Sequence, residues 1–400
     1  MDRPSLTAVK RSDICISVRF LQEDRPEVFC NLATRTLDDA LALLRQVRPT
    51  RLEWSYVSDR EHISQLREIA PVFVAALNAR AGHARSFSGD PVMAPWMRHF
   101  GTPDARYLYL CQHNPEDFQM QVDRIQGYVR DGLTCFHMDD WFTNPMMVFF
   151  GDPCFCEHCM REFSRYLGIP LDYHAYLRGR GFTTAAELLA AAERAEVPLW
   201  PDYMRFQRQT VGLYLRRLKA AMNRAYPEGA TLSVNDIASR ESAEVALPAI
   251  DYFDGEVTDI SAGALLEIAD ASRQCGKLQV VLICPDETER EDRTSAAWIN
   301  RVRQALAVSY CLGMVPLFPY DVYMRSDSRG RPKPRWFGTW EEYGTPFEIV
   351  RQHPDWFDDF DFESVATDNR GAVTVVSRRR RRKRLALTHT IAPDGAWQTK

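Results

Sequence analysis

Short apolar runs alternate with helix-like segments along the chain, and this alternation limits the fold more than any other feature. Eight runs are rich in β-branched, aromatic or aliphatic residues, as strands are. They cover residues 14–20, 51–57, 72–77, 134–138, 231–234, 252–257, 279–284 and 314–318. Amphipathic segments separate them, at 37–47, 60–69, 115–130, 157–167, 203–226, 262–275 and 295–312. Eight strands that alternate with helical segments predict a (β/α)8 TIM barrel.

The length of 400 residues suits one barrel with additions. We expect the barrel to span residues 1–365, with the strand-like run 106–111 in an excursion after the third strand and an insertion at 168–202. Residues 366–400 predict a short C-terminal β extension, a β-hairpin that could begin a further β-domain. Its arginine-rich run, 378–384, is interpreted as a solvated hairpin turn. Binding of a polyanion or nuclear import is the less favoured reading of that run.

Charge and hydropathy exclude several classes of partner. The net charge of −4 predicts no general affinity for nucleic acid or anionic membranes. No stretch approaches the roughly 18 uninterrupted apolar residues of a membrane span. The first residues lack the apolar core of a secretory signal, so we expect a cytoplasmic protein. A homo-oligomer is compatible with the sequence.

Four cysteines have the spacing of a metal site. Cys154, Cys156 and Cys159 form Cys-x-Cys-x-x-Cys, and Cys111 supplies a fourth sulfur. Four sulfurs complete a tetrahedron around zinc and leave no open position, so we predict a structural zinc. The other six cysteines lie singly, which indicates reduced thiols rather than a disulfide framework. The fallback ligands are His113 and His158.

Acidic, amide and aromatic residues gather at the predicted carboxyl ends of the strands, where barrel enzymes hold their active sites. Carboxylates supply the acid, base and nucleophile of glycoside hydrolysis, and aromatic rings stack against sugars. The candidate catalytic residues are Asp140, Glu256, Asp286, Glu287 and Asp321. The candidate substrate-binding residues are Trp54, Asn78, Asp139, Trp141, Asn235 and Tyr320.

Residues 105–167 resemble the family 42 glycoside hydrolases, β-galactosidase-type barrels of clan A. The resemblance rests on Tyr-Leu-Cys-Gln-His-Asn-Pro (109–115), Asp-Asp-Trp (139–141) and the cysteine motif with its aromatic-rich helix. It implies that the four cysteines bind zinc and that Asp140 stands in the place of the acid/base glutamate, with Asp139 in the asparagine position. The chain departs from the family at the end of the seventh strand, where Cys284 occupies the region of the nucleophile.

These observations predict a glycoside hydrolase that cleaves O-glycosidic bonds of a carbohydrate substrate with two carboxylates. Asp140 is expected to be the general acid/base, and Glu256 leads the candidates for the second role, ahead of Asp286, Glu287 and Asp321. One alternative is a non-catalytic carbohydrate-binding barrel that has lost its nucleophile. Another is a barrel lyase or isomerase acting on sugars, with His137 or Tyr320 transferring the proton.

Overall fold

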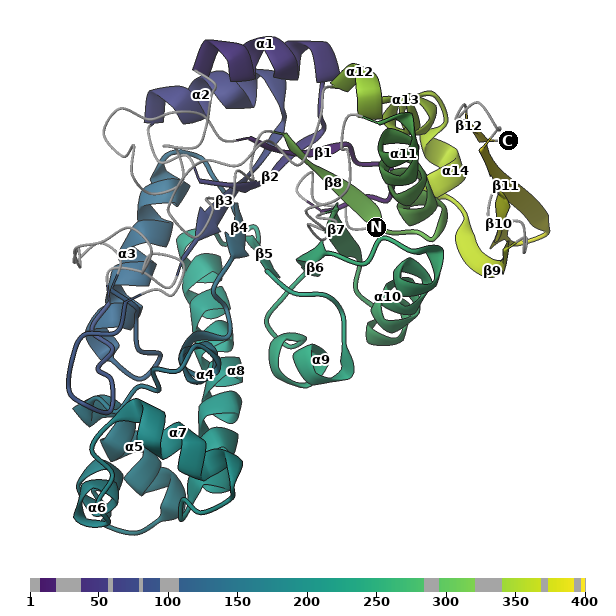
Figure 1. The fold of residues 1–400 in the computed structure, drawn as a ribbon. Coiled ribbons are helices and arrows are strands. Elements are labelled where there is room, and N and C mark those ends of the chain that lie inside the picture. Colours follow the sequence, from purple (N-terminus) through teal and green to yellow (C-terminus); the bar gives the residue numbers. More distant parts are fainter. Residues whose placement is uncertain are drawn as a thin grey trace.

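Eight parallel strands close into a barrel in chain order (Figure 1). The computed structural model describes residues 8–18, 37–56, 60–78, 82–93, 108–283, 295–320, 340–367, 373–391 and 397–399. The strands are β1 (Cys15–Val18), β2 (Arg51–Ser55), β3 (Val72–Leu77), β4 (Cys135–Met138), β5 (Thr231–Val234), β6 (Tyr252–Val257), β7 (Gln279–Ile283) and β8 (Val315–Tyr320). Strand β1 pairs with both β2 and β8, which closes the ring. The predicted (β/α)8 fold is confirmed.

The strands are buried on both faces, because helices cover the outside of a parallel barrel and side chains fill its interior. Every residue of β2, β3, β4, β5 and β7 is buried. Gly255 in β6 allows one close approach. A Cβ at this position would lie 2.4 Å from both the carbonyl carbon and the oxygen of Asp236, so glycine lets the segment after β5 lie against β6.

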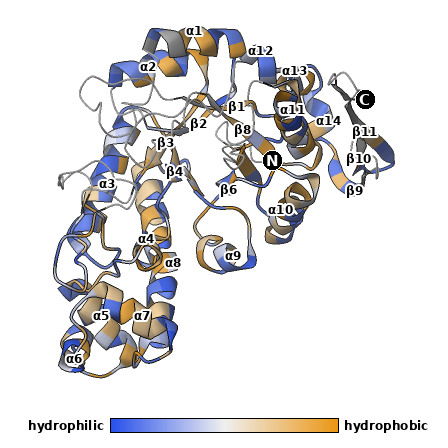
Figure 2. Ribbon diagram, in the orientation of Figure 1, coloured by the Kyte–Doolittle hydropathy of each residue, from blue (hydrophilic) through white to orange (hydrophobic). Residues whose placement is uncertain are grey.

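Seven helices predicted from the sequence form close to their expected bounds. They are α1 (Leu37–Val47), α2 (Arg60–Ile69), α3 (Pro115–Arg130), α5 (Glu157–Leu167), α8 (Trp200–Ala225), α10 (Ala262–Cys275) and α11 (Ala296–Cys311). Capping side chains mark the starts of α3, α10 and α11: Asn114, Ser261 and Ser295 each accept a backbone N–H of the first turn. Helices α1, α2 and α3 alternate hydrophobic and hydrophilic residues in Figure 2, as helices with one face on a core do. No described helix combines the length and hydrophobicity that a membrane span requires.

Between β4 and β5 the chain forms a lobe, which we define as α4 (Thr143–Phe149), α5, α6 (Tyr173–Gly179), α7 (Ala185–Glu193) and the first half of α8. The lobe projects from the barrel on the side where α4 and α9 (Arg240–Ala246) follow β4 and β5 (Figure 1). Aromatic rings fill its core: Phe163 contacts Tyr173 and Tyr203 at centroid distances of 5.0 and 5.1 Å. The short helices α4, α6 and α9 were not predicted.

The C-terminal segment forms a four-stranded antiparallel sheet in the order β12-β11-β10-β9. The strands are β9 (Asp361–Thr367), β10 (Val373–Arg380), β11 (Lys383–Ile391) and β12 (Trp397–Thr399), after α12 (Trp340–Tyr343), α13 (Thr345–Gln352) and α14 (Pro354–Asp358). The sheet confirms the β extension, although it is larger than a hairpin. One residue corrects the reading of the arginine run: Arg378 is fully buried and donates to the carbonyl oxygens of Phe357 and Phe360, so it joins the sheet to α14 rather than facing solvent. The domain division at residue 365 stays a prediction.

Candidate active site and cysteine cluster

The ends of three strands that carry predicted site residues meet around Asp139, which directly follows β4. The Oδ1 atom of Asp139 accepts a hydrogen bond from Asn235 Nδ2, after β5, at 2.8 Å. The Oδ2 atom accepts one from the hydroxyl of Tyr56, after β2. Tyr56 also accepts from Trp54 Nε1 at 3.0 Å, and Trp54 itself is only 2% exposed. The ends of β2, β4 and β5 are thus tied together through one carboxylate.

Asp140 and Trp141 lie beside this group. Asp140 is 6% exposed, and its carboxylate lies near Tyr109 in the segment that precedes Cys111. Burial raises the pKa of Tyr109 well above its usual value, and the negative charge of Asp140 adds to this shift. Trp141 donates from Nε1 to the carbonyl oxygen of Asn235 at 3.0 Å. The charge of the predicted general acid therefore acts on the same excursion that supplies the fourth cysteine.

The remaining candidates are less fully placed. Glu256 is exposed near the end of β6, whereas the residues on either side of it are buried. Asn78, after β3, is buried, and its backbone oxygen accepts from Gln121 at 2.8 Å. Tyr320 ends β8. The residues that lie outside the described ranges are Cys284, Asp286, Glu287 and Asp321.

Charged residues occupy the interior of the barrel beneath this group, and they were not predicted from the sequence. Arg51 Nε lies 2.6 Å from Glu53 Oε1, and the side chains are 1% and 0% exposed. Tyr252 donates its hydroxyl to Glu53 Oε2 at 2.9 Å. Asp13 Oδ2 lies 3.9 Å from Arg51 Nε. Alternation is the signal that could have found them, since opposite charges two residues apart on one strand share a face.

Asp254 and His137 form a second buried pair in the interior. His137 Nδ1 lies 3.6 Å from Asp254 Oδ2 and 3.0 Å from Ser233 Oγ. Burial raises the pKa of Asp254 well above its usual range, and the negative charge of Glu53 raises it further. Burial lowers the pKa of His137 to about 3. Burial therefore keeps His137 uncharged at neutral pH and favours the protonated form of Asp254.

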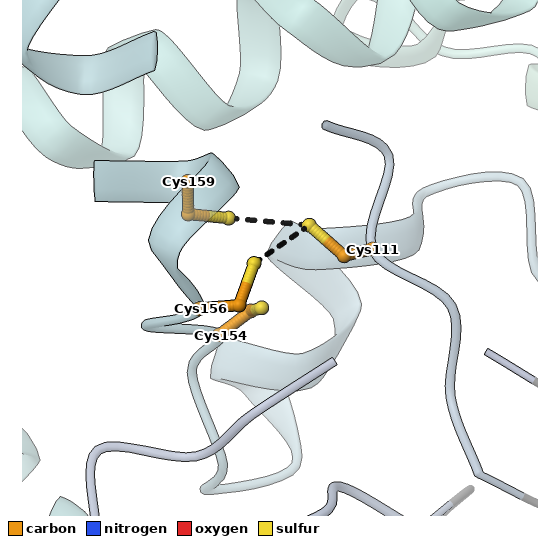
Figure 3. Close-up of side chains that lie close together, drawn as sticks. All are labelled: Cys111, Cys154, Cys156 and Cys159. Carbon is orange, nitrogen blue, oxygen red and sulfur yellow. Dashed lines mark hydrogen bonds between the residues drawn. The ribbon is translucent and has the colours of Figure 1, made fainter. Parts of the chain in front are cut away.

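The four predicted cysteines come together at the junction of the lobe and the barrel. Their sulfurs all lie within 4.8 Å of one another, and all four residues are buried (Figure 3). Cys111 Sγ lies 3.3 Å from Cys159 Sγ and 3.5 Å from Cys156 Sγ. A tetrahedral zinc with Zn–S bonds of about 2.3 Å separates its sulfurs by about 3.8 Å, so this donor set fits the metal in number, chemistry and spacing.

Local structure positions these sulfurs. Cys156 is the N-cap of α5 and Cys159 lies in its first turn, so the positive end of the helix dipole faces them. Asp117 accepts from the backbone N–H of Cys111 at 2.6 Å and of His83 at 3.0 Å, which fixes the approach of the fourth ligand. The fallback ligands are engaged elsewhere: His113 stacks on Phe206, and His158 contacts Arg161.

Comparisons with known proteins support the fold. No family model and no curated protein sequence matches this chain. The structure is similar to an α-amylase from Geobacillus thermoleovorans complexed with acarbose, with a TM-score of 0.54 and 9% identity over 95% of this chain and 87% of that one. A maltogenic α-amylase from Thermotoga neapolitana gives 0.52 and 10% over 95% and 86% of the two chains. A cyclic α-maltosyl-(1→6)-maltose hydrolase from Arthrobacter globiformis gives 0.50 and 11% over 96% and 92%.

At such low identity these likenesses establish a shared barrel and nothing finer. Two of the three are α-amylases, and none of the three is described as a family 42 enzyme. The family 42 resemblance therefore stays a prediction from the sequence.

Proposed function

We propose that this protein is a glycoside hydrolase whose active site lies at the carboxyl ends of the barrel strands. The observation that carries the proposal is the group around Asp139, which joins the ends of β2, β4 and β5 and includes polar and aromatic side chains. Hydroxyl-rich ligands need such a combination of carboxylates, amides and rings. The structurally similar α-amylase and cyclic α-maltosyl-(1→6)-maltose hydrolase act on glycosidic bonds. Their similar fold supports the proposal without setting the substrate.

In this proposal Asp140 donates a proton to the leaving glycosidic oxygen, and a second carboxylate attacks the sugar or activates a water. Glu256 is the first candidate for the second role, because it is exposed near the carboxyl end of β6. Asp286, Glu287 and Asp321 follow it. Asp139 already accepts hydrogen bonds from Asn235 and Tyr56, so we assign it to holding the substrate rather than to exchanging the proton.

We further propose that Cys111, Cys154, Cys156 and Cys159 bind one structural zinc. When bound, the metal cross-links the segment before α3 to the start of α5. Four buried sulfurs leave no position for a substrate or a water. The site would therefore support the shape of the rim rather than take part in the reaction.

The alternative functions require different features of the site. A lyase or isomerase that used His137 would need this ring to reach the substrate, but His137 is fully buried beside Trp54 at a centroid distance of 4.5 Å. A carbohydrate-binding barrel needs no general acid at all. Catalytic tests on Asp140 therefore separate it from the hydrolase.

The test is hydrolysis of two series of glycosides, aryl glycosides with activated leaving groups and alkyl glycosides with poor ones. Asp140→Asn should lower kcat/KM on the alkyl series by about 10²- to 10⁴-fold, the usual contribution of general acid catalysis, and much less on the aryl series. Asp123→Asn, an exposed residue of α3, is the matched control and should leave both series unchanged. Equal losses on both series would assign Asp140 to binding. No turnover by wild-type protein, combined with measurable sugar binding, would favour the binding barrel.

The second carboxylate is found by replacing each candidate with its amide and adding azide or formate. A small anion can occupy the vacated space, so only the variant that has lost the nucleophile or base should recover activity. If no inactive variant recovers while Asp140→Asn is dead, the two-carboxylate mechanism fails for this chain.

A further inference from the structure

Two amide side chains lie against the sulfurs of the cysteine cluster, and neither was expected from the sequence. Asn144, in α4, and Gln207, in α8, are each 1% exposed. Asn144 Nδ2 lies 3.1 Å from Cys159 Sγ and 3.6 Å from Cys111 Sγ. Gln207 Nε2 lies 3.9 Å from Cys159 Sγ. All three distances are within the range of N–H···S hydrogen bonds.

The neighbours of Asn144 fix which end of its amide faces the cluster. Its Oδ1 accepts the backbone N–H of Gln112 at 3.2 Å, and only an oxygen can do so. Its Nδ2 donates to Gln207 Oε1 at 3.0 Å, and only a nitrogen can do so. The amide therefore has a single satisfied orientation, with an N–H directed at the sulfurs. The donor role of Asn144 follows from its hydrogen-bond network rather than from an arbitrary amide assignment.

The charge of a metal-bound cluster explains why hydrogen-bond donors beside the sulfurs would be stabilising. Four thiolates around one divalent cation carry a net charge of −2, and here that charge would be buried. Burial of a charge is costly unless hydrogen-bond donors surround it. Neutral amide N–H groups stabilise the sulfurs without cancelling their affinity for the metal. Partners of this kind, outside the metal ligands, typically contribute about 10- to 100-fold to metal affinity.

We propose that Asn144 and Gln207, the amide pair, donate N–H hydrogen bonds to the cluster and stabilise its metal-bound form. This inference rests on the proposed zinc site. The amide pair also connects the zinc site to the proposed active site, because Asp140 lies in the loop that leads into α4, the helix that contains Asn144. Gln112 strengthens the connection, since its Oε1 accepts from Thr143 and from the backbone N–H of Asn144.

The experiment measures the metal rather than catalysis. Zinc transfer from the protein to a chromophoric chelator gives relative affinity, and the thiolate-to-metal absorption of cobalt-substituted protein reports on the sulfurs themselves. Asn144→Asp keeps the size of the side chain but replaces the donor with a carboxylate. We expect it to weaken zinc binding by about 10- to 100-fold and to shift the cobalt–thiolate band. Asn300→Asp, a buried amide of α11 away from the cluster, is the control and should leave both unchanged.

Gln207→Met provides a second route if the first variant does not fold, and it should change both readouts in the same direction by a smaller factor. Wild-type protein that binds no zinc or cobalt would overturn the metal site, and the role of the amide pair with it. Wild-type protein that binds zinc, with affinity and cobalt spectrum unaltered in the folded variants, would overturn the amide pair alone.

Discussion

The ion pair between Arg51 and Glu53 gives a sharp test of the charged barrel interior. The two side chains are 2.6 Å apart and almost fully buried. Glu53→Gln keeps the side-chain size and an oxygen that can accept from Tyr252, but it leaves a guanidinium in the interior without its counter-charge. Neutralising one partner of a buried pair costs about 3–5 kcal/mol. Asp13 lies 3.9 Å from Arg51 and retains part of the attraction, so we expect a loss near the lower end of that range.

Urea unfolding at neutral pH measures the free energy of unfolding directly. The matched control is Glu196→Gln, which removes a 2.8 Å pair with Arg194 whose side chains are 55% and 59% exposed, and its stability should equal that of wild type. The double variant Arg51→Met with Glu53→Leu should recover much of the loss, because it removes both charges of the pair. Asp13 then loses Arg51 but keeps its hydrogen bonds from Lys10 N and Thr50 Oγ1. The reasoning is refuted if Glu53→Gln is as stable as the exposed control, or if the double variant is as unstable as the single one.

Three further predictions concern the metal, the buried acid and the tight contact on β6. Cys156→Ser should abolish stoichiometric zinc and lower the thermal midpoint, as elemental analysis and calorimetry would show, because the metal-bound loop loses its anchor; unchanged stability would contradict the metal site. The folded-state pKa of Asp254 is raised, so its contribution to stability is complete below about pH 4 and is lost as the pH rises toward the folded pKa. Asp254→Asn should therefore gain on wild type in urea unfolding as the pH rises above about 4, and a constant difference would show that the pKa of Asp254 is not raised in the fold. Gly255→Ala should destabilise the protein, because the added Cβ would lie 2.4 Å from the backbone of Asp236. Gly263→Ala should not, because a Cβ there would meet nothing within 4 Å.

The barrel was predictable from the sequence because the physics of its elements is local. Each strand is an apolar run, and helices such as α3 and α10 begin at a capping residue that is visible in the sequence. The short helix α4 (Thr143–Phe149) was missed because it contains asparagine and proline and is too short to show a period. It is held by tertiary contacts, as the hydrogen bonds of Asn144 illustrate.

The candidate site was predictable in part. The carboxyl ends of neighbouring barrel strands lie close together, so Asp139 and Asn235 could be expected to meet. The spacing of the cysteines predicted their cluster. The interior charges were not expected, because a charged residue in a strand is ordinarily taken to face solvent. Arg51 and Glu53 instead satisfy each other inside the ring. Their two-residue spacing places both charges on one face of β2, but whether that face points into the ring depends on strands distant in the chain.

Helix α8 runs from the lobe to the barrel wall, so its length and twist set the direction in which the lobe faces the barrel. Its 26 residues span about 39 Å; Tyr203 packs in the lobe near one end, while Tyr214 contacts Phe118 of α3 at a centroid distance of 5.9 Å. An insertion of one residue between these two tyrosines would turn the lobe by about 100° relative to the barrel wall, whereas seven residues would restore its facing to within about 20°. Insertions and deletions within this stretch should therefore be tolerated best at lengths of about seven or eleven residues, while the loops between the lobe helices remain free to vary in length.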